Sequence, residues 1–345
     1  MANYSAPTND NISRAMEAVG IIPEELRGSD TFLDVVTWNI KYFHDRDPAR
    51  VEAIAKILGV LNADILVLQE ILDGSMDTVA AKLRESGAGH YVAAHGKSGG
   101  QQRVAMLWDL DWIRAKDDIR ELFSEEPVLT PDQKDAFPRK PLLGHFSALG
   151  GNGVEAAFDF QLCGVHLKSQ RGGGELQRRL ASEWLAHWFR YDAAAVDTDI
   201  ILAGDWNATV DSEAWDAFRE LEKSGEALFE QINDKSEISH LYYKSKREIG
   251  SRLDLVAVSM ASAARLVDEG SKVVRWAPLA DLLEASPSAQ EIKNYIKTVS
   301  GDRRGVGGIS DHLPVITRFY FAKPAAVAKR RTARSAAAKT SRTRK

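Results

Sequence analysis

The chain has a single cysteine, Cys163, among 345 residues, so it cannot form an intrachain disulfide. It has no apolar run long enough to span a membrane. Its first residues lack the basic region and apolar stretch of a secretory signal. These absences favour a reducing compartment, and we expect a cytoplasmic protein. Cys163 lies in an apolar stretch, which favours a core position over a reactive one.

The charge is divided unevenly along the chain. The net charge is −4, but residues 323–345 contain nine Lys or Arg and no Asp or Glu. Residues 1–322 therefore carry a net charge of −13. We expect three parts: a polar N-terminal arm or short helix (1–30), a body (31–322) and a basic, disordered tail (323–345).

Strands and helices alternate along most of the body, which predicts a layered α/β architecture. Residues 117–145 contain four prolines and are expected to form a long irregular excursion. Residues 263–308 have the character of an insertion, with two helices and a basic, glycine-rich loop. We expect the loops at 96–103, 117–145 and 263–308 to decide which substrate is accepted.

The apolar run from Ile200 to Ala203 predicts a buried strand, and polar side chains follow it directly. Gly204 is expected to let the backbone turn where this strand ends. Since successive strand side chains point to opposite faces, Asp205 and Asn207 share a face if the extended geometry continues. The pair suits polar chemistry beside a phosphate, although Asp and Asn after a strand also form turns through side-chain bonds to the backbone.

Other apolar runs end in, contain or follow polar residues in the same way. Each such residue has an ordinary alternative as a turn former, a solvated edge carboxylate or a hydrogen-bonded core histidine. Together they have the usual layout of an α/β active site, in which polar groups gather at strand ends. The residues concerned are Asn39, Glu70, His166, Asp254, Asp311 and His312.

This polar set lacks the Cys/His clustering of a zinc site. Oxygen ligands without soft donors favour Mg²⁺, with Mn²⁺ as the alternative. A hard divalent ion with imidazoles and amide donors suits phosphoester hydrolysis, in which positioning and charge neutralisation dominate.

The motifs carry a family resemblance. In order and approximate spacing they resemble the endonuclease/exonuclease/phosphatase superfamily, which includes pancreatic-type deoxyribonucleases, abasic-site endonucleases, neutral sphingomyelinases and inositol-polyphosphate phosphatases. The resemblance covers roughly residues 31–322 and implies a four-layered α/β sandwich, with two mainly antiparallel sheets face to face and flanking helices. The motifs are Thr37-Trp38-Asn39, Leu68-Gln69-Glu70, Gly204-Asp205-Trp206-Asn207, Arg252-Leu253-Asp254 and Ser310-Asp311-His312.

The resemblance implies catalytic roles for five residues. Asp205 would orient and activate the attacking water, and Asn207 would hydrogen-bond the phosphate or that water. His312 would contact the phosphate and stabilise its developing charge, or serve as general acid or base. Asp254 would accept a hydrogen bond from His312 and favour its charged form. His166 resembles the second catalytic histidine of the deoxyribonuclease branch.

The resemblance also implies a metal site, with Glu70 as the main Mg²⁺ ligand, Asn39 beside it and Asp311 in support. Abasic-site endonucleases have an Asp two residues after the first-motif Asn, where this chain has Lys41. They also have a Tyr and an Asn around Cys163 and His166, so the comparison argues against abasic-site repair.

Two further branches also differ from this chain. In the deoxyribonuclease branch a Glu pairs with the histidine that corresponds to His166. The best match here is Gln102, which carries no charge, so we expect His166 to be less basic. The Trp-Thr-Asp-Arg signature of inositol phosphatases is absent from the sequence.

Substrate contacts are predicted for Lys168 and Arg171, with Arg139, Lys140, Arg303 and Arg304 as further basic candidates, although scattered basic residues are usually solvated surface. The tail 323–345 is expected to hold nucleic acid non-specifically. The alternatives for the tail are solubilisation or attraction to anionic lipid.

The sequence therefore predicts an intracellular, Mg²⁺-dependent phosphodiester hydrolase, with an endonuclease acting on DNA or RNA as the leading hypothesis. The alternative within the family is a phosphatase or phospholipid phosphodiesterase. The alternative of another class is a non-catalytic nucleic-acid-binding module. The sequence leaves the oligomeric state open.

Overall fold

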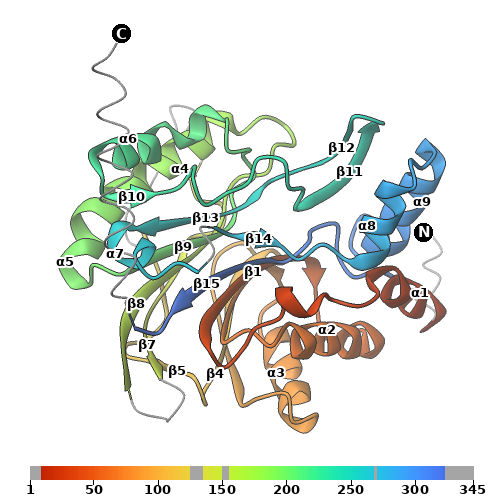
Figure 1. The fold of residues 1–345 in the computed structure, drawn as a ribbon, viewed down its shortest axis with the longest axis horizontal. Coiled ribbons are helices and arrows are strands. Elements are labelled where there is room, and N and C mark those ends of the chain that lie inside the picture. The colour runs from red at the N-terminus through yellow and green to blue at the C-terminus, as the bar shows by residue number, and fades with distance from the viewer. Residues whose placement is uncertain (1–8, 125–134, 150–154, 268–269, 323–345) are drawn as a thin grey trace.

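A computed structural model of the chain describes residues 9–124, 135–149, 155–267 and 270–322. Two large β-sheets lie face to face, and helices cover the outer face of each sheet (Figure 1). The four-layered α/β sandwich expected from the sequence is confirmed. In both sheets antiparallel pairs predominate, and each sheet contains one parallel pair.

In the first sheet, β1 and β2 form the parallel pair. The order of strands across it is β14 (Lys272–Val273), β15 (Val315–Tyr320), β1 (Phe32–Phe43), β2 (Ile65–Ile71), β4 (Arg103–Asp109) and β3 (Tyr91–His95).

In the second sheet, β8 and β9 form the parallel pair, and β6 (Arg120–Glu121) adds to β7 off the main path. A separate hairpin joins β11 (His240–Ser245) to β12 (Glu248–Ser251). The order across the second sheet is β10 (Ala227–Leu228), β13 (Asp254–Ser259), β9 (Ile200–Asp205), β8 (Glu155–His166), β7 (Leu142–Leu149) and β5 (Ile113–Ala115).

Helices form the two outer layers. The first sheet is covered by α1 (Asn9–Val19), α2 (Pro48–Leu61), α3 (Ser75–Glu85), α8 (Ala277–Glu284) and α9 (Ala289–Ser300). The second sheet is covered by α4 (Glu175–His187), which continues as a π-helical segment (Trp188–Ala193), and by α6 (Asp216–Ser224). The short elements are α5 (Ala194–Val196), α7 (Met260–Ala263) and the 3₁₀ turns Glu24–Leu26 and Glu213–Trp215.

Side-chain alternation along β1 shows how the layers are built. Leu33 and Val35 belong to the apolar layer between the two sheets, whereas Val36 and Trp38 pack on the opposite face with the helices. Because both faces of the central strands are buried, their sequences read as continuous apolar runs.

Several local predictions can be compared with the structure. Asp47 caps α2, and its side chain accepts a hydrogen bond from the Arg50 backbone N–H at 3.2 Å. The prediction of an irregular excursion over 117–145 is wrong for the last residues of this range, because β7 begins at Leu142. The prolines end at Pro141, directly before this strand, so they mark the loop and not the strand that follows.

The described part of the expected N-terminal arm packs onto the body. Ile12, Ala15 and Val19 of α1 are buried with the helices of the first sheet. The Tyr295 hydroxyl of α9 donates to the Ala18 carbonyl at 2.8 Å. The basic tail at 323–345 lies outside the described residues. Within the described ranges, every helix is too short or too polar to cross a membrane.

Gly204 lies inside β9, so the turn expected at this residue is wrong. It pairs with Val165 of the parallel neighbour β8. A Cβ atom on Gly204 would come within 2.0 Å of the Val165 carbonyl oxygen. Glycine is therefore needed because two backbones approach closely, one residue before Asp205.

We predict that Gly204→Ala lowers the free energy of unfolding by about 3 kcal/mol, since the added methyl group forces the two strands apart. Gly87→Ala is the control, because Gly87 has a positive φ but no atom within 4 Å of the new Cβ. That variant should lose only about 1 kcal/mol, from backbone strain. Urea denaturation measures both, and equal losses would contradict the steric argument.

Candidate active site

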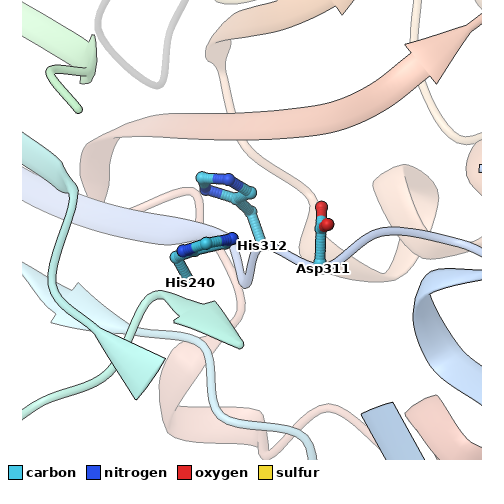
Figure 2. Close-up of side chains that lie close together, drawn as sticks. All are labelled: His240, Asp311 and His312. Atoms are coloured by element: carbon cyan, nitrogen blue, oxygen red, sulfur yellow. The ribbon is translucent and has the colours of Figure 1, made fainter. Parts of the chain in front are cut away.

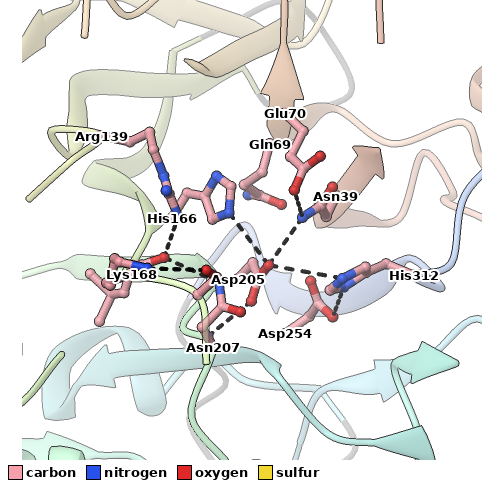
Figure 3. A network of polar contacts seen from close by, with 12 residues as sticks. Asn39, Gln69, Glu70, Arg139, His166, Lys168, Asp205, Asn207, Asp254 and His312 are labelled. Atoms are coloured by element: carbon pink, nitrogen blue, oxygen red, sulfur yellow. Dashed lines mark hydrogen bonds and ion pairs between the residues drawn. The ribbon is translucent and has the colours of Figure 1, made fainter. Parts of the chain in front are cut away.

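Both sheets present strand ends to one common edge. The parallel strands β1 and β2 end there, as do β8 and β9, while the antiparallel strand β13 begins there. The loop before β15 reaches the same place. These elements bring together Asn39, Glu70, His166, Asp205, Asp254 and His312 (Figure 3).

Asp205 lies at the centre of this group and is almost completely buried. Its Oδ2 accepts a hydrogen bond from the Asn39 side-chain amide at 3.0 Å. The Nε2 atoms of His166 and His312 lie 3.7 Å and 3.9 Å from the same oxygen. One carboxylate thus faces two imidazoles, one at the end of β8 and one in the loop before β15.

Charges around Asp205 set the protonation of its neighbours. Burial raises the pKa of Asp205 to about 6, although the positive charge of His312 acts in the opposite direction. Burial alone would lower the pKa of His312, but the carboxylates of Asp254 and Asp205 outweigh it and raise that pKa to about 10. The His312 Nδ1 lies 2.8 Å from Asp254 Oδ2, so its N–H donates a hydrogen bond to this carboxylate. At neutral pH the site holds an ionised Asp205 beside an imidazolium.

His166 has the opposite electrostatic character. Burial and the positive charges of Arg139 and His312 lower the pKa of His166 well below its usual value. The imidazole is therefore neutral at pH 7, in line with the weaker basicity expected from the sequence. The two histidines of the site consequently differ in charge.

The turn after Asp205 brings Asn207 back into the site. Asn207 has a φ of 52°, and its backbone N–H donates to Asp205 Oδ1 at 2.9 Å. Its side-chain amide donates to the Leu167 carbonyl at 3.1 Å. The extended geometry does not continue to Asn207. A side-chain-to-backbone turn places it instead, as the ordinary alternative predicts, and its catalytic role stays a prediction.

Glu70 lies on a strained backbone at the neighbouring strand ends. Its φ is 60°, and the β1–β2 register shifts between Asn39 and Phe43. Glu70 Oε2 accepts the backbone N–H of Tyr42 at 3.0 Å. Oε1 lies 3.5 Å from the Asn39 amide nitrogen. Left-handed non-glycine residues and bulges cluster at functional sites, where they change the direction in which a side chain points.

The Asn39 side-chain amide contacts two carboxylates and the backbone of its own strand. The amide nitrogen faces the carboxylates of Asp205 and Glu70, and the amide oxygen accepts the Lys41 backbone N–H at 2.9 Å. Ser310 Oγ donates to the Asn39 carbonyl at 2.7 Å, which joins this strand end to the loop of His312. Asn39 therefore positions both carboxylates.

Asp311 lies beside this group, and its carboxylate forms a 2.9 Å ion pair with the Lys41 ammonium. Among the described residues, two sets of three His or Asp side chains are close enough to share a metal ion: His240, Asp311 and His312, and Asp205, Asp254 and His312. Figure 2 shows the first set. Glu70 belongs to neither set.

Sequence reasoning missed His240 and did not single out Arg139. The His240 ring lies 4.5 Å from that of His312, and burial with the His312 charge lowers its pKa to about 4. Arg139 is buried near His166 and donates to the Leu167 carbonyl. His240 lies in a polar hairpin without periodicity, and Arg139 was one of six scattered basic candidates, so neither had a distinguishing pattern.

The two predicted substrate-binding residues lie on the loop after β8. The Lys168 ammonium is 3.3 Å from the carbonyl of Arg171 and 3.3 Å from Ser169 Oγ. Arg171 is exposed on the far part of this loop. Lys168 lies beside Asn207 (Figure 3), and the substrate contacts of both residues stay predictions.

Comparison with known proteins supports the fold and the family. A sequence model described as the Endonuclease/Exonuclease/phosphatase family matches residues 36–312. No curated protein sequence matches this chain.

Several solved structures share the fold. The human Nocturnin catalytic domain with bound sulfate anion is 16% identical, with 85% of this chain and 95% of that chain covered and a TM-score of 0.56. D. rerio TDP2 humanized by 14 mutations is 15% identical, with 84% of this chain and 99% of that chain covered and a TM-score of 0.54. D. rerio TDP2 complexed with single strand DNA product is 14% identical, with 84% of this chain and 99% of that chain covered and a TM-score of 0.51.

We predict that the His312 ring stays protonated until the pH approaches about 10, because Asp254 and Asp205 hold its charge. Its folded pKa lies above the ordinary 6.5, so its stabilising contribution is complete below about pH 6.5 and is lost as the pH rises through 10. NMR titration of the ring measures this, and Asp254→Asn should lower the pKa.

Asp111→Asn is the matched control, since it removes a 2.8 Å partner of the exposed His90. It should lower the pKa of His90 and leave His312 unchanged. A wild-type His312 that titrates near 6.5 would contradict the assignment.

Proposed function

This chain belongs to the Endonuclease/Exonuclease/phosphatase family, and we propose that it is a divalent-metal-dependent phosphodiester hydrolase whose substrate is nucleic acid. One observation carries the proposal. A buried, ionised carboxylate, Asp205, faces one neutral and one positively charged histidine at the junction of the two sheets. Such a group holds a base and two hydrogen-bond donors around the place of one phosphate.

The residues present fit a hard divalent cation. Glu70 is only partly buried, and its Oε1 has a single, long contact of 3.5 Å. Mg²⁺ is commonly held by one or two carboxylates, with water and substrate phosphate as its other ligands. Glu70 and Asp311 would hold the ion, with Asn39 fixing Glu70. When bound, the ion would neutralise charge on the reacting phosphate.

Asp205 is proposed as the general base. Its carboxylate is held by the Asn39 amide and by the Asn207 backbone N–H, which leaves its orientation fixed. With a pKa of about 6 it is ionised at neutral pH and still basic enough to accept a proton from water. The water would attack phosphorus as Asp205 takes its proton, and the bond from phosphorus to the leaving oxygen would break as that oxygen takes a proton from solvent.

The two histidines are proposed to stabilise the charge that develops on the phosphate. His312 holds a proton on Nε2 while Nδ1 is committed to Asp254, so it offers a charged donor toward the substrate. The neutral His166 offers a second donor through Nε2, on the opposite side of Asp205. Charged hydrogen bonds in a buried site stabilise such a transition state strongly.

Nucleic acid is the first substrate class to test. A protein of the same fold, D. rerio TDP2, is complexed with single strand DNA product. The basic tail at 323–345 adds a positively charged segment suited to phosphate backbones. A phosphomonoester or a phospholipid head group presents the same phosphate chemistry and is the alternative.

We predict that Asp205→Asn reduces Mg²⁺-dependent cleavage of single-stranded DNA, plasmid DNA or structured RNA by about 10³-fold or more. Asp281→Asn, on the exposed face of α8, is the control and should retain full activity. The wild-type rate should rise with pH through about 6, as Asp205 loses its proton, and should stay high while His312 keeps its own.

Two other outcomes would change the proposed substrate or the proposed class of protein. Turnover of a generic phosphodiester but of no nucleic acid would redirect the substrate to lipid or sugar phosphates. Nucleic-acid binding without turnover, together with the absence of Mg²⁺ binding in calorimetry, would favour a non-catalytic binding module.

A further inference from the structure

A lysine of this chain already provides a positive charge to one proposed metal ligand. The Lys41 Nζ lies 2.9 Å from Asp311 Oδ2, and the two side chains are 13% and 24% exposed. Such low exposure distinguishes this ion pair from ordinary surface pairs, whose charges are screened by water. A divalent cation that approaches Asp311 therefore meets an ammonium that is already bound to it.

The backbone that carries Lys41 is fixed. Lys41 and Tyr42 both have left-handed φ values, 44° and 50°, at the end of β1. The buried guanidinium of Arg50 donates to the carbonyls of Ile40 and Lys41 at 2.7 and 2.8 Å, and to that of Ile309 at 2.8 Å. Arg50 thereby ties this turn to the loop that precedes Asp311.

The same turn serves both proposed metal ligands. The Tyr42 backbone N–H binds Glu70 Oε2 at 3.0 Å, while the Lys41 side chain binds Asp311. A Cβ atom on Gly305 would lie 2.6 Å from the Lys41 carbonyl oxygen, so the 301–308 loop closes over the turn as well. The backbone position of Lys41 is therefore fixed by the fold, and its ammonium reaches Asp311 from this constrained turn.

We propose that Lys41 is a resident cation of the metal centre, which competes with the divalent ion for Asp311 and keeps its affinity low. The inference rests on the metal dependence proposed above. A divalent ion that engages Asp311 must displace the ammonium or bind beside a like charge, and either event opposes binding. The ion would then depend mainly on Glu70 and on the substrate phosphate, so metal and substrate would bind cooperatively.

The test is a titration with Mn²⁺ followed by electron paramagnetic resonance, which counts bound and free ion without any substrate. Lys41→Met should bind Mn²⁺ about tenfold more tightly than wild type, since a partly buried like charge has been removed. Lys41→Arg should bind like wild type. Lys56→Met, on the exposed face of α2, controls for the loss of one positive charge and should change the affinity little.

A second variant and a second background make the test specific. Lys41→Asn removes the charge with a residue that tolerates the left-handed backbone, and it should reproduce the tighter binding if Lys41→Met does not fold. In an Asp311→Asn background, Lys41→Met should no longer tighten binding, because the shared ligand is gone.

The outcomes separate the two proposals. Mn²⁺ binding to wild type with equal or weaker binding to Lys41→Met and Lys41→Asn would overturn the role of Lys41 and leave metal dependence standing. An absence of Mn²⁺ binding to every variant would overturn the metal dependence and this inference together.

Discussion

The arrangement of this molecule depends on one buried carboxylate. Asp205 is the last residue of β9 and contacts both sheets, through Asn39 and His312 on one side and through His166 and the register with Asp254 on the other. A buried carboxylate requires hydrogen bonds and compensating charge, and these requirements fix the positions of the surrounding polar groups. Gly204 makes the arrangement sterically feasible by letting β8 and β9 approach closely just before this residue.

The opposite half of the site is built on backbone strain. Glu70, Lys41 and Tyr42 all adopt left-handed conformations. Such residues persist where the surrounding structure over-determines them. Here the guanidinium of Arg50 supplies much of the constraint at Lys41 and Tyr42, since it is buried and donates to carbonyls of two segments, the end of β1 and the loop at Ile309. Rigid sheets thus carry a small set of strained ends on which the polar chemistry depends.

The sequence predicts the strands that are buried on both faces, because such strands read as uninterrupted runs of apolar residues. The strands that carry Asn39, Glu70 and Asp254 follow from such runs, and so does the four-layered class. The β11–β12 hairpin, which brings His240 against His312, is polar and partly exposed, so no pattern indicates it.

Contacts between distant segments could not be derived from the sequence. The ion pair of Lys41 with Asp311 and the burial of Arg139 arise only when the sheets meet. The role of Gly204 was also misjudged, since a glycine at a strand end is typical of a turn, whereas here it answers a close approach of two backbones.

The central claim is that water, activated by Asp205, attacks phosphorus directly. The most direct test is hydrolysis of a phosphodiester of defined chirality at phosphorus, a phosphorothioate, in water enriched in ¹⁸O. Direct attack by water gives inversion of configuration, with one solvent oxygen in the product phosphate. Retention of configuration would indicate a covalent enzyme intermediate, and solvent oxygen in the alcohol product would indicate cleavage of the carbon–oxygen bond. Either result would contradict the account.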